Sequence, residues 1–115
     1  MGLGDPPQPA DLPKLQQLDQ LVIERLQSHV FVGFEEGALT FPPTYKYIPG
    51  QNRYDRRPEK KMRCPAWCDR VLWRVGGTTS TTIVPEFYAS CQQVVTSDHK
   101  PVKFLGRVVM REGAK

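Results

Sequence analysis

The spacing of apolar residues predicts one helix near the start of the chain. The apolar positions recur every three or four residues, as on one face of a helix, and they are Leu15, Leu18, Leu21, Val22 and Leu26. Asp11 and Pro13 stand just before them, and both residue types are common where helices begin. We therefore expect a helix over about residues 13–28, after a Gly- and Pro-rich segment, residues 1–10, that should be disordered.

Four later segments have the alternation and the β-branched or aromatic content of strands. The predicted strands are 44–47, 69–75, 86–95 and 101–110. A polar, basic loop over 48–62 and a flexible turn over 76–82 separate them. A helix followed by four strands predicts an α/β (α+β) fold with mainly antiparallel strands. One helix cannot cover both faces of such a sheet, so we expect part of a larger domain rather than a self-sufficient core.

Length and cysteine content narrow the class of protein. With 115 residues the chain has the size of one domain. It has no apolar run of the roughly 20 residues that a membrane helix needs, and its N-terminus lacks the basic and apolar regions of a secretory signal. The three cysteines, Cys64, Cys68 and Cys91, are odd in number and lack zinc-site spacing, so we expect free thiols in a reducing compartment.

Positive charge is concentrated in the middle of the chain. The formal net charge is +4, and residues 44–74 alone hold nine Lys or Arg against three Asp or Glu. Such a segment attracts phosphate on a small ligand, on a membrane surface or on nucleic acid. A solvated loop without a partner is the alternative explanation.

Ser97-Asp98-His99 lies between two predicted strands, where a loop can present side chains at the end of a rigid sheet. A histidine beside an aspartate can change its charge near neutral pH. The three residues do not form a serine-hydrolase triad, because sequence neighbours rarely have triad geometry and no GxSxG elbow is present. A turn held by local bonds from Asp and Ser to the backbone explains the same residues without chemistry.

Three stretches, in this order, resemble the inositol polyphosphate 5-phosphatase family. They are FEEGALTFPPTYKY at 34–47, RCPAWCDRVLW at 63–73 and SDHKPV at 97–102. The resemblance implies the C-terminal part of a DNase I-like two-sheet α/β sandwich, with residues 11–111 as a partial catalytic domain and 112–115 as a tail. The implied activity is Mg²⁺-dependent removal of the 5-phosphate from phosphoinositides or soluble inositol polyphosphates, by a cytoplasmic protein that associates peripherally with membranes.

The resemblance also implies the residues that would carry the chemistry. His99 would bond an oxygen of the scissile phosphate and stabilise its developing charge. Asp69 would pair with His99, hold the orientation of the ring and favour its protonated form. Asp98 would lie beside the Mg²⁺ ion and its water network, because magnesium prefers oxygen ligands.

The same resemblance assigns substrate binding to the basic segment. Guanidinium and ammonium groups make charge-assisted bonds to phosphate, and the residues implied to bind the 4-phosphate of the inositol ring are Tyr45, Lys46, Lys61 and Arg63. Arg70 would either join this substrate-binding group or brace a structural ion pair. Lys100 is expected to be solvated, and Trp67 and Trp73 are expected to pack in the core.

Part of the family's machinery is not found in this sequence. The motif GDxNYR and an upstream metal-binding glutamate of the family have no counterpart here. We therefore expect the chain alone to have little or no phosphatase activity, because hydrolysis of phosphate esters is very slow without catalysis. The main alternative is a non-catalytic module that binds anionic lipid or inositol phosphate. A nuclease-like relative is a third, but PAWCDR and TYKY favour an inositide, so no nucleic acid partner is expected.

Overall fold

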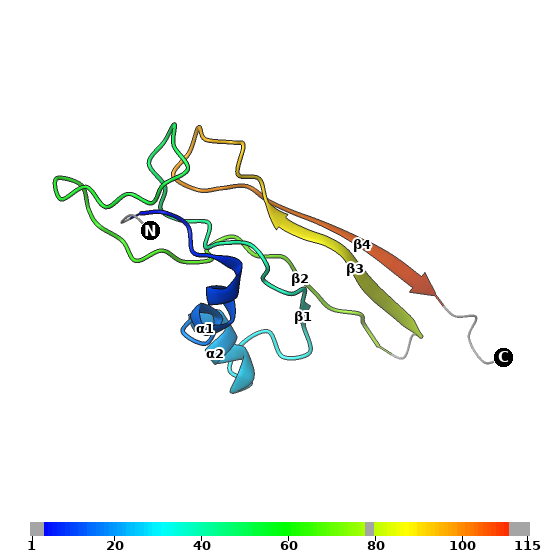
Figure 1. Cartoon of the computed structure of the whole chain (residues 1–115). Helices are drawn as coiled ribbons and strands as arrows, with labels where there is room; N and C mark the ends of the chain where they lie inside the picture. Colours follow the sequence, from blue (N-terminus) through cyan, green and yellow to red (C-terminus); the bar gives the residue numbers. More distant parts are fainter. Residues whose placement is uncertain (1–3, 78–79, 111–115) are drawn as a thin grey trace.

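The computed structural model describes residues 4–77 and 80–110 and shows an elongated molecule (Figure 1). Its extents are 64 × 30 × 24 Å and its radius of gyration is 17.0 Å. A compact chain of this length would have a radius of gyration of about 13 Å. The excess length comes from a two-stranded ribbon that extends away from the two helices and the loops around them (Figure 1).

The N-terminal part forms two short helices in place of the single helix predicted over 13–28. A 3₁₀ turn, Pro9–Asp11, leads into α1, Leu12–Gln16, and α2 follows at Gln20–Leu26. The break arises because Asp19 acts as the N-cap of α2: its side chain accepts a hydrogen bond from the backbone N–H of Val22. An N-cap residue has extended backbone geometry, so a helix cannot run through it.

Residues 4–10 follow a defined path, although they belong to the segment expected to be disordered. The backbone N–H of Tyr54 donates to the carbonyl of Gly4 at 2.7 Å, and Arg53 pairs with Asp5 at 3.3 Å. Residues 1–3 of that segment, and the predicted tail at 112–115, lie outside the described residues. The start of the described chain is thus attached to the basic loop.

Two of the predicted strands are much shorter than expected. Of the strand predicted over 69–75, only β2, Leu72–Trp73, is paired, and it runs antiparallel to β1, Glu35–Glu36. The segment 44–47 forms isolated bridges instead of a continuous strand: Tyr45 with Ala66 and with His99, and Tyr47 with Tyr54. This segment therefore joins several loops rather than extending a sheet.

The other two predicted strands form the ribbon. It consists of β3, Thr81–Ser90, and β4, Val102–Met110, paired antiparallel with a register shift between Pro85 and Phe87. The strand predicted over 86–95 begins and ends earlier, and the turn predicted over 76–82 overlaps its start. The chain leaves the ribbon after Ser90 and turns back, with Val94 donating its N–H to the carbonyl of Cys91.

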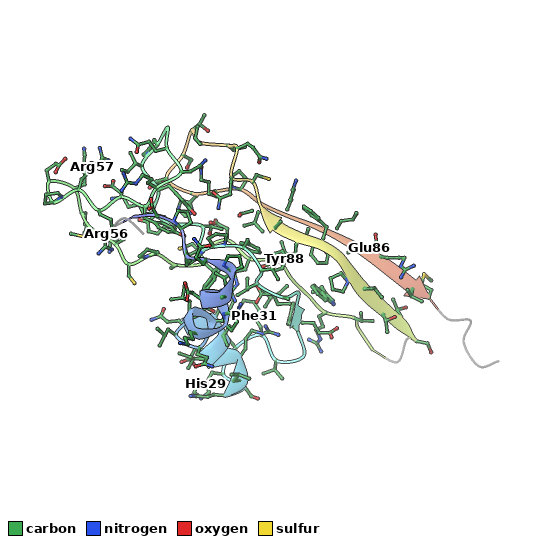
Figure 2. The ribbon with its side chains drawn as sticks, in the orientation of Figure 1. His29, Phe31, Arg56, Arg57, Glu86 and Tyr88 are labelled. Carbon is green, nitrogen blue, oxygen red and sulfur yellow. The ribbon has the colours of Figure 1, made fainter. Side chains whose placement is uncertain are left out.

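The core lies where the helices, the central loops and the near end of the ribbon meet. Its buried members are Leu12, Leu39, Phe41, Trp67 and Tyr88. The indole N–H of Trp67 donates to the carbonyl of Phe41 at 2.8 Å, so the residue is buried with its polar atom satisfied. Figure 2 shows Tyr88 at this junction and Glu86 farther out on the ribbon. The expectation that Trp67 packs in the core is confirmed, and Trp73 packs its ring against Phe104.

Much apolar surface remains exposed in this structure. On the ribbon Leu105 is 58% exposed and Val108 57%, and at the end of α2 Leu26 is 81% exposed. A hollow of about 1050 Å³ with mostly apolar walls lies between the helices and residues 64–68. Monomeric soluble proteins rarely leave so much apolar surface uncovered. That the chain is part of a larger domain stays a prediction. No helix in residues 4–77 or 80–110 is long and apolar enough to cross a membrane.

Candidate active site

The segment 44–47 bonds both of the later stretches that carry the family resemblance, 63–73 and 97–102. The N–H of Thr44 donates to the carbonyl of Ala66, and the N–H of Lys100 donates to the carbonyl of Thr44. Tyr47 extends the same pattern by donating its N–H to the carbonyl of Asp98 at 2.8 Å. Because one segment is bonded on both sides, the residues that follow Ala66 and those around Asp98 become neighbours.

Asp69 and His99 are in direct contact at this point. The Nδ1 atom of His99 lies 2.9 Å from Oδ2 of Asp69, and the same oxygen accepts a 2.9 Å hydrogen bond from the hydroxyl of Thr44. An ionised carboxylate can only accept, so Nδ1 carries the proton and Nε2 is the ring nitrogen left for an external group. The contact between Asp69 and His99 implied by the resemblance is present, while the catalytic roles of both residues stay predictions.

Ser97 shapes the turn that presents the histidine. The N–H of His99 donates to Oγ of Ser97 at 3.1 Å, and the Ser97 hydroxyl reaches Oδ1 of Asp98 at 3.4 Å. The local bonds expected of a turn are therefore present together with the contact to Asp69. A cavity of about 610 Å³ opens beside this turn, and its walls include Asp69, Ser97 and His99.

Asp98 is the residue expected to lie beside a magnesium ion. Its carboxylate offers oxygen atoms of the kind that Mg²⁺ prefers. The part of the chain that the structure describes contains no group of three or more His, Cys, Asp or Glu side chains able to hold a metal ion. Asp98 can thus supply one ligand, but the described residues do not form a complete metal site.

Of the residues expected to bind a ring phosphate, Tyr45 is the one in contact with His99. The rings of Tyr45 and His99 are in contact, with centroids 4.6 Å apart and planes inclined by 44°. Lys46 follows Tyr45, and its Nζ donates to the carbonyl of Lys61 at 2.8 Å. The side chain of Lys46 is therefore held against the segment that carries Lys61 and Arg63, both of which are exposed. The structure brings these residues into one region but does not test whether they bind a phosphate.

Arg70 forms a buried structural ion pair, which was one of the two roles expected for it. Only 7% of its side chain is exposed. Its guanidinium donates to both carboxylate oxygens of Glu36, at 2.6 and 2.8 Å, and to Asp19 at 2.9 Å. Burial acts to lower the pKa of Arg70, but the hydrogen bonds to the two carboxylates outweigh it and raise this pKa. Arg70 therefore links α2, β1 and the strand after Asp69, and its geometry favours the structural ion pair.

Lys100 is buried, which corrects the expectation that it is solvated. Its exposed fraction is 0%, and its Nζ donates to Oδ1 of Asn52 and to the carbonyls of Gln92 and Val94. Burial lowers the pKa of Lys100. The burial of Lys100 could have been predicted from the alternation of side chains in an extended segment. Neighbouring side chains there point to opposite sides, so Lys100 points inward when His99 is half-exposed.

Thr44 is a second site residue that the sequence analysis did not single out. It is fully buried and bonds Asp69 with its hydroxyl and two other segments with its backbone. A carboxylate with two partners on one oxygen is fixed more firmly than one with a single partner. The position of Thr44 just before Tyr45 was the available signal, because it begins the stretch TYKY.

The carboxyl group of Asp55 predicts that the stability of the fold depends on pH. It is buried and accepts hydrogen bonds from Nε and Nη2 of Arg57 at 2.9 and 2.8 Å. These bonds hold the pKa of Asp55 well below its ordinary value of 3.8, although burial acts in the other direction. Near pH 4 the unfolded chain then binds more protons than the folded chain, so Asp55 stabilises the fold above this pH and the contribution is lost as pH falls.

Urea unfolding of the wild type and of Asp55→Asn measures this contribution. Between about pH 6 and pH 3 the free energy of unfolding should fall more steeply in the wild type than in the variant, since only the wild type carries the depressed carboxyl pKa. Equal acid sensitivity of the two proteins would contradict the prediction.

The chain is similar to known proteins over most of its length. Residues 5–105 match the family model described as Endonuclease/Exonuclease/phosphatase family 2. The chain is 42% identical over 103 residues to the phosphatidylinositol polyphosphate 5-phosphatase type IV of Homo sapiens, which covers 90% of this chain. It belongs to the inositol polyphosphate 5-phosphatase family. The type IV inositol polyphosphate 5-phosphatase 7 of Arabidopsis thaliana is also similar, with 44% identity over 91 residues and 76% of this chain covered.

Solved structures show the fold of this 5-phosphatase family member. The inositol polyphosphate 5-phosphatase domain of SpSynaptojanin, in complex with inositol (1,4)-bisphosphate and calcium ion, matches with a TM-score of 0.69 and 36% identity over 87% of this chain. The mixed α/β fold with antiparallel strands and a DNase I-like relation is thereby confirmed. The chain spans 28% of that domain's chain, and 14% and 15% of the Arabidopsis and human relatives.

A second kind of structure matches equally well. Cimex nitrophorin, solved as a ferrous NO complex, has a TM-score of 0.73 and 34% identity over 87% of this chain, which spans 33% of the nitrophorin chain. A 5-phosphatase domain and a nitrophorin therefore share this fold, and fold alone does not assign an activity. The assignment of function to this chain has to come from its side chains.

Proposed function

We propose that this chain carries the phosphate-recognition part of a 5-phosphatase active site that acts on phosphoinositides or soluble inositol polyphosphates. The observation that carries the proposal is the contact of His99 with Asp69, which Thr44 also bonds. An imidazole anchored through Nδ1 presents Nε2 as a donor to a phosphate oxygen when it is protonated. This arrangement stabilises the negative charge that develops on a phosphoryl group.

The basic residues give the site its selectivity in this proposal. Lys46, Lys61 and Arg63 supply charge-assisted bonds to a second phosphate on the inositol ring. The ring of Tyr45 contacts His99, and Lys46 bonds the carbonyl of Lys61. Two anionic groups at a fixed separation distinguish an inositol bisphosphate from inorganic phosphate. A single ring thus bridges His99 and the cations.

Magnesium is the proposed metal, and it would neutralise phosphoryl charge when bound. Asp98 would supply one of its oxygen ligands, because Mg²⁺ prefers oxygen donors. We place the working protein in the cytoplasm, at the membrane surface where phosphoinositides are found, since its free cysteines suit a reducing compartment. The chain alone is expected to release little or no phosphate.

Titration calorimetry with inositol 4,5-bisphosphate tests the proposal on the chain itself, because this ligand carries both the 5-phosphate expected at His99 and the 4-phosphate expected at the basic residues. We expect His99→Ala and the double variant Lys61→Ala/Arg63→Ala each to lower the affinity about tenfold or more, as a lost hydrogen bond to a charged group predicts. Lys103→Ala is the control, because Lys103 lies on the ribbon and not in the site. Binding that is unaffected by both site variants would refute the proposed site.

A lipid-binding module remains the second candidate, because Arg56 and Lys60 add exposed positive charge next to Lys61. Binding to vesicles with and without phosphatidylinositol 4,5-bisphosphate, at matched surface charge, distinguishes the lipid-binding module from the phosphatase site. Binding that depends only on charge and survives His99→Ala favours the module. Displacement of the inositol bisphosphate by DNA, but not by inositol polyphosphates, would instead favour a nuclease-like relative.

A further inference from the structure

The ammonium group of Lys100 lies at a junction of segments beneath the candidate site. Its Nζ is 2.6 Å from Oδ1 of Asn52, 3.0 Å from the carbonyl of Val94 and 3.3 Å from the carbonyl of Gln92. It also lies 4.8 Å from the centre of the Tyr47 ring, within the range of a cation–π contact. Each of the three N–H donors of the ammonium therefore has an acceptor.

All three acceptors are neutral groups, which makes this arrangement costly. A buried charge loses its hydration, and hydrogen bonds to neutral groups replace only part of the lost free energy. An apolar side chain of similar volume would avoid that cost. What an apolar side chain cannot do is fix directions, because it makes no directional bonds. The ammonium ties the loop that carries Asn52 to the turn at 92–94 in one arrangement.

These two segments carry the two sides of the site. The turn at 92–94 continues into Asp98 and His99, and the loop that carries Asn52 follows directly on Tyr45 and Lys46. The main chain adds two more links between them: Tyr47 donates its N–H to the carbonyl of Asp98, and Gly50 donates its N–H to the carbonyl of Val95 at 2.5 Å. Side chains add further links: the ammonium of Lys100 bonds Asn52, Gln92 and Val94, and the side-chain amide of Gln92 donates to the hydroxyl of Tyr47 at 3.4 Å.

We propose that Lys100 is a positioning residue, which sets the distance and orientation between His99 with Asp98 on one side and Tyr45 with Lys46 on the other. It touches neither substrate nor metal, and it acts through the loop and the turn that it binds. The inference rests on the proposed function only for the identity of the ligand. The placement of the imidazole against Asp69 and Tyr45 can be measured without any ligand.

Lys100→Met tests this, because methionine has a similar length and removes only the ammonium. Two readouts are compared in the full chain: the ¹⁵N chemical shifts of the His99 ring, which report the Nδ1 contact with Asp69, and the affinity for inositol 4,5-bisphosphate. We expect the ring shifts to move toward those of a free imidazole and the affinity to fall about tenfold, as for a lost charge-assisted contact. Lys103→Met is the matched control, and it should leave both readouts unchanged.

Asn52→Ala decides the matter if Lys100→Met does not fold. Asn52 is exposed, so its truncation removes one acceptor of the ammonium with little other change, and both readouts should move in the same direction by a smaller amount. The inference would be overturned if Lys100→Met folds and keeps the ring shifts and the affinity of the wild type. If Lys100→Met does not fold, the same result for Asn52→Ala would overturn it. Absence of inositol bisphosphate binding by the wild type would refute the proposed function instead, while the ring shifts would still test Lys100.

Discussion

Arg70→Met should lower the free energy of unfolding by about 3–5 kcal/mol, the loss expected when one partner of a buried ion pair is removed. Methionine fills most of the space of the arginine stem but leaves the carboxylates of Glu36 and Asp19 without the guanidinium that bonds them. Tyr88 also donates its hydroxyl to Glu36, at 2.6 Å, so the loss extends to a core residue on β3. Small domains have a total stability of about 5–15 kcal/mol, so this loss is a large fraction of the total and should lower the urea concentration at the unfolding midpoint.

Arg107→Met provides the comparison, followed by urea unfolding and circular dichroism. Arg107 pairs with Glu86 on the ribbon at 3.4 Å, but its side chain is 64% exposed. Its replacement should change the stability by less than about 1 kcal/mol, because exposed pairs are screened by water. Equal losses in the two arginine variants would show that Arg70 does not brace the fold in the way its contacts indicate.

Trp67→Ala should cost a similar amount, about 3–5 kcal/mol, for a different reason. Trp67 is buried at the centre of the core with Leu12, Leu39, Phe41 and Tyr88. Truncation removes its apolar contacts, leaves a cavity and frees the carbonyl of Phe41 that accepts the indole N–H. Because Asp69 follows two residues later, a collapse of this cavity should also displace Asp69 from His99.

Trp67→Phe separates packing from hydrogen bonding at the same position. Phenylalanine keeps most of the apolar volume and loses only the N–H, so we expect a loss of about 1–3 kcal/mol from the unsatisfied carbonyl. Circular dichroism in urea is the measurement, since the change removes one of the two tryptophans that fluorescence would report. A phenylalanine variant as unstable as the alanine variant would contradict a main role for packing.

The sequence allowed β4 and, through the resemblance, the contact within the site to be predicted, but not the bounds of the helices or of β3. β4 was expected over 101–110 and is found at Val102–Met110, because alternation and β-branched residues dominate there. The apolar spacing over 13–28 ran through Asp19, and the capping preference of that aspartate prevailed over the helical periodicity. Local periodicity predicts an element well only where no residue inside it competes for the backbone.

The contact of Asp69 with His99 was implied by resemblance rather than by periodicity. No local rule relates two residues 30 positions apart in sequence, and the bonds that join them pass through Thr44 and Ala66. The buried position of Lys100 was missed for the related reason that a lysine is almost never buried unless it is paired. The acceptors of its ammonium, one side chain and two carbonyls, come from two loops whose meeting cannot be predicted from either one.

The open ribbon affects how the protein behaves when it is concentrated. Among the described residues β3 and β4 pair only with each other, so each has an outer edge of free backbone groups beside exposed apolar side chains such as Leu105 and Val108. Such edges are templates for strand addition and aggregation. Pro85, the irregularity next to it and the charges of Lys103 and Arg107 are the features that oppose this, so purification at low salt, where like charges repel most, should keep the protein dispersed.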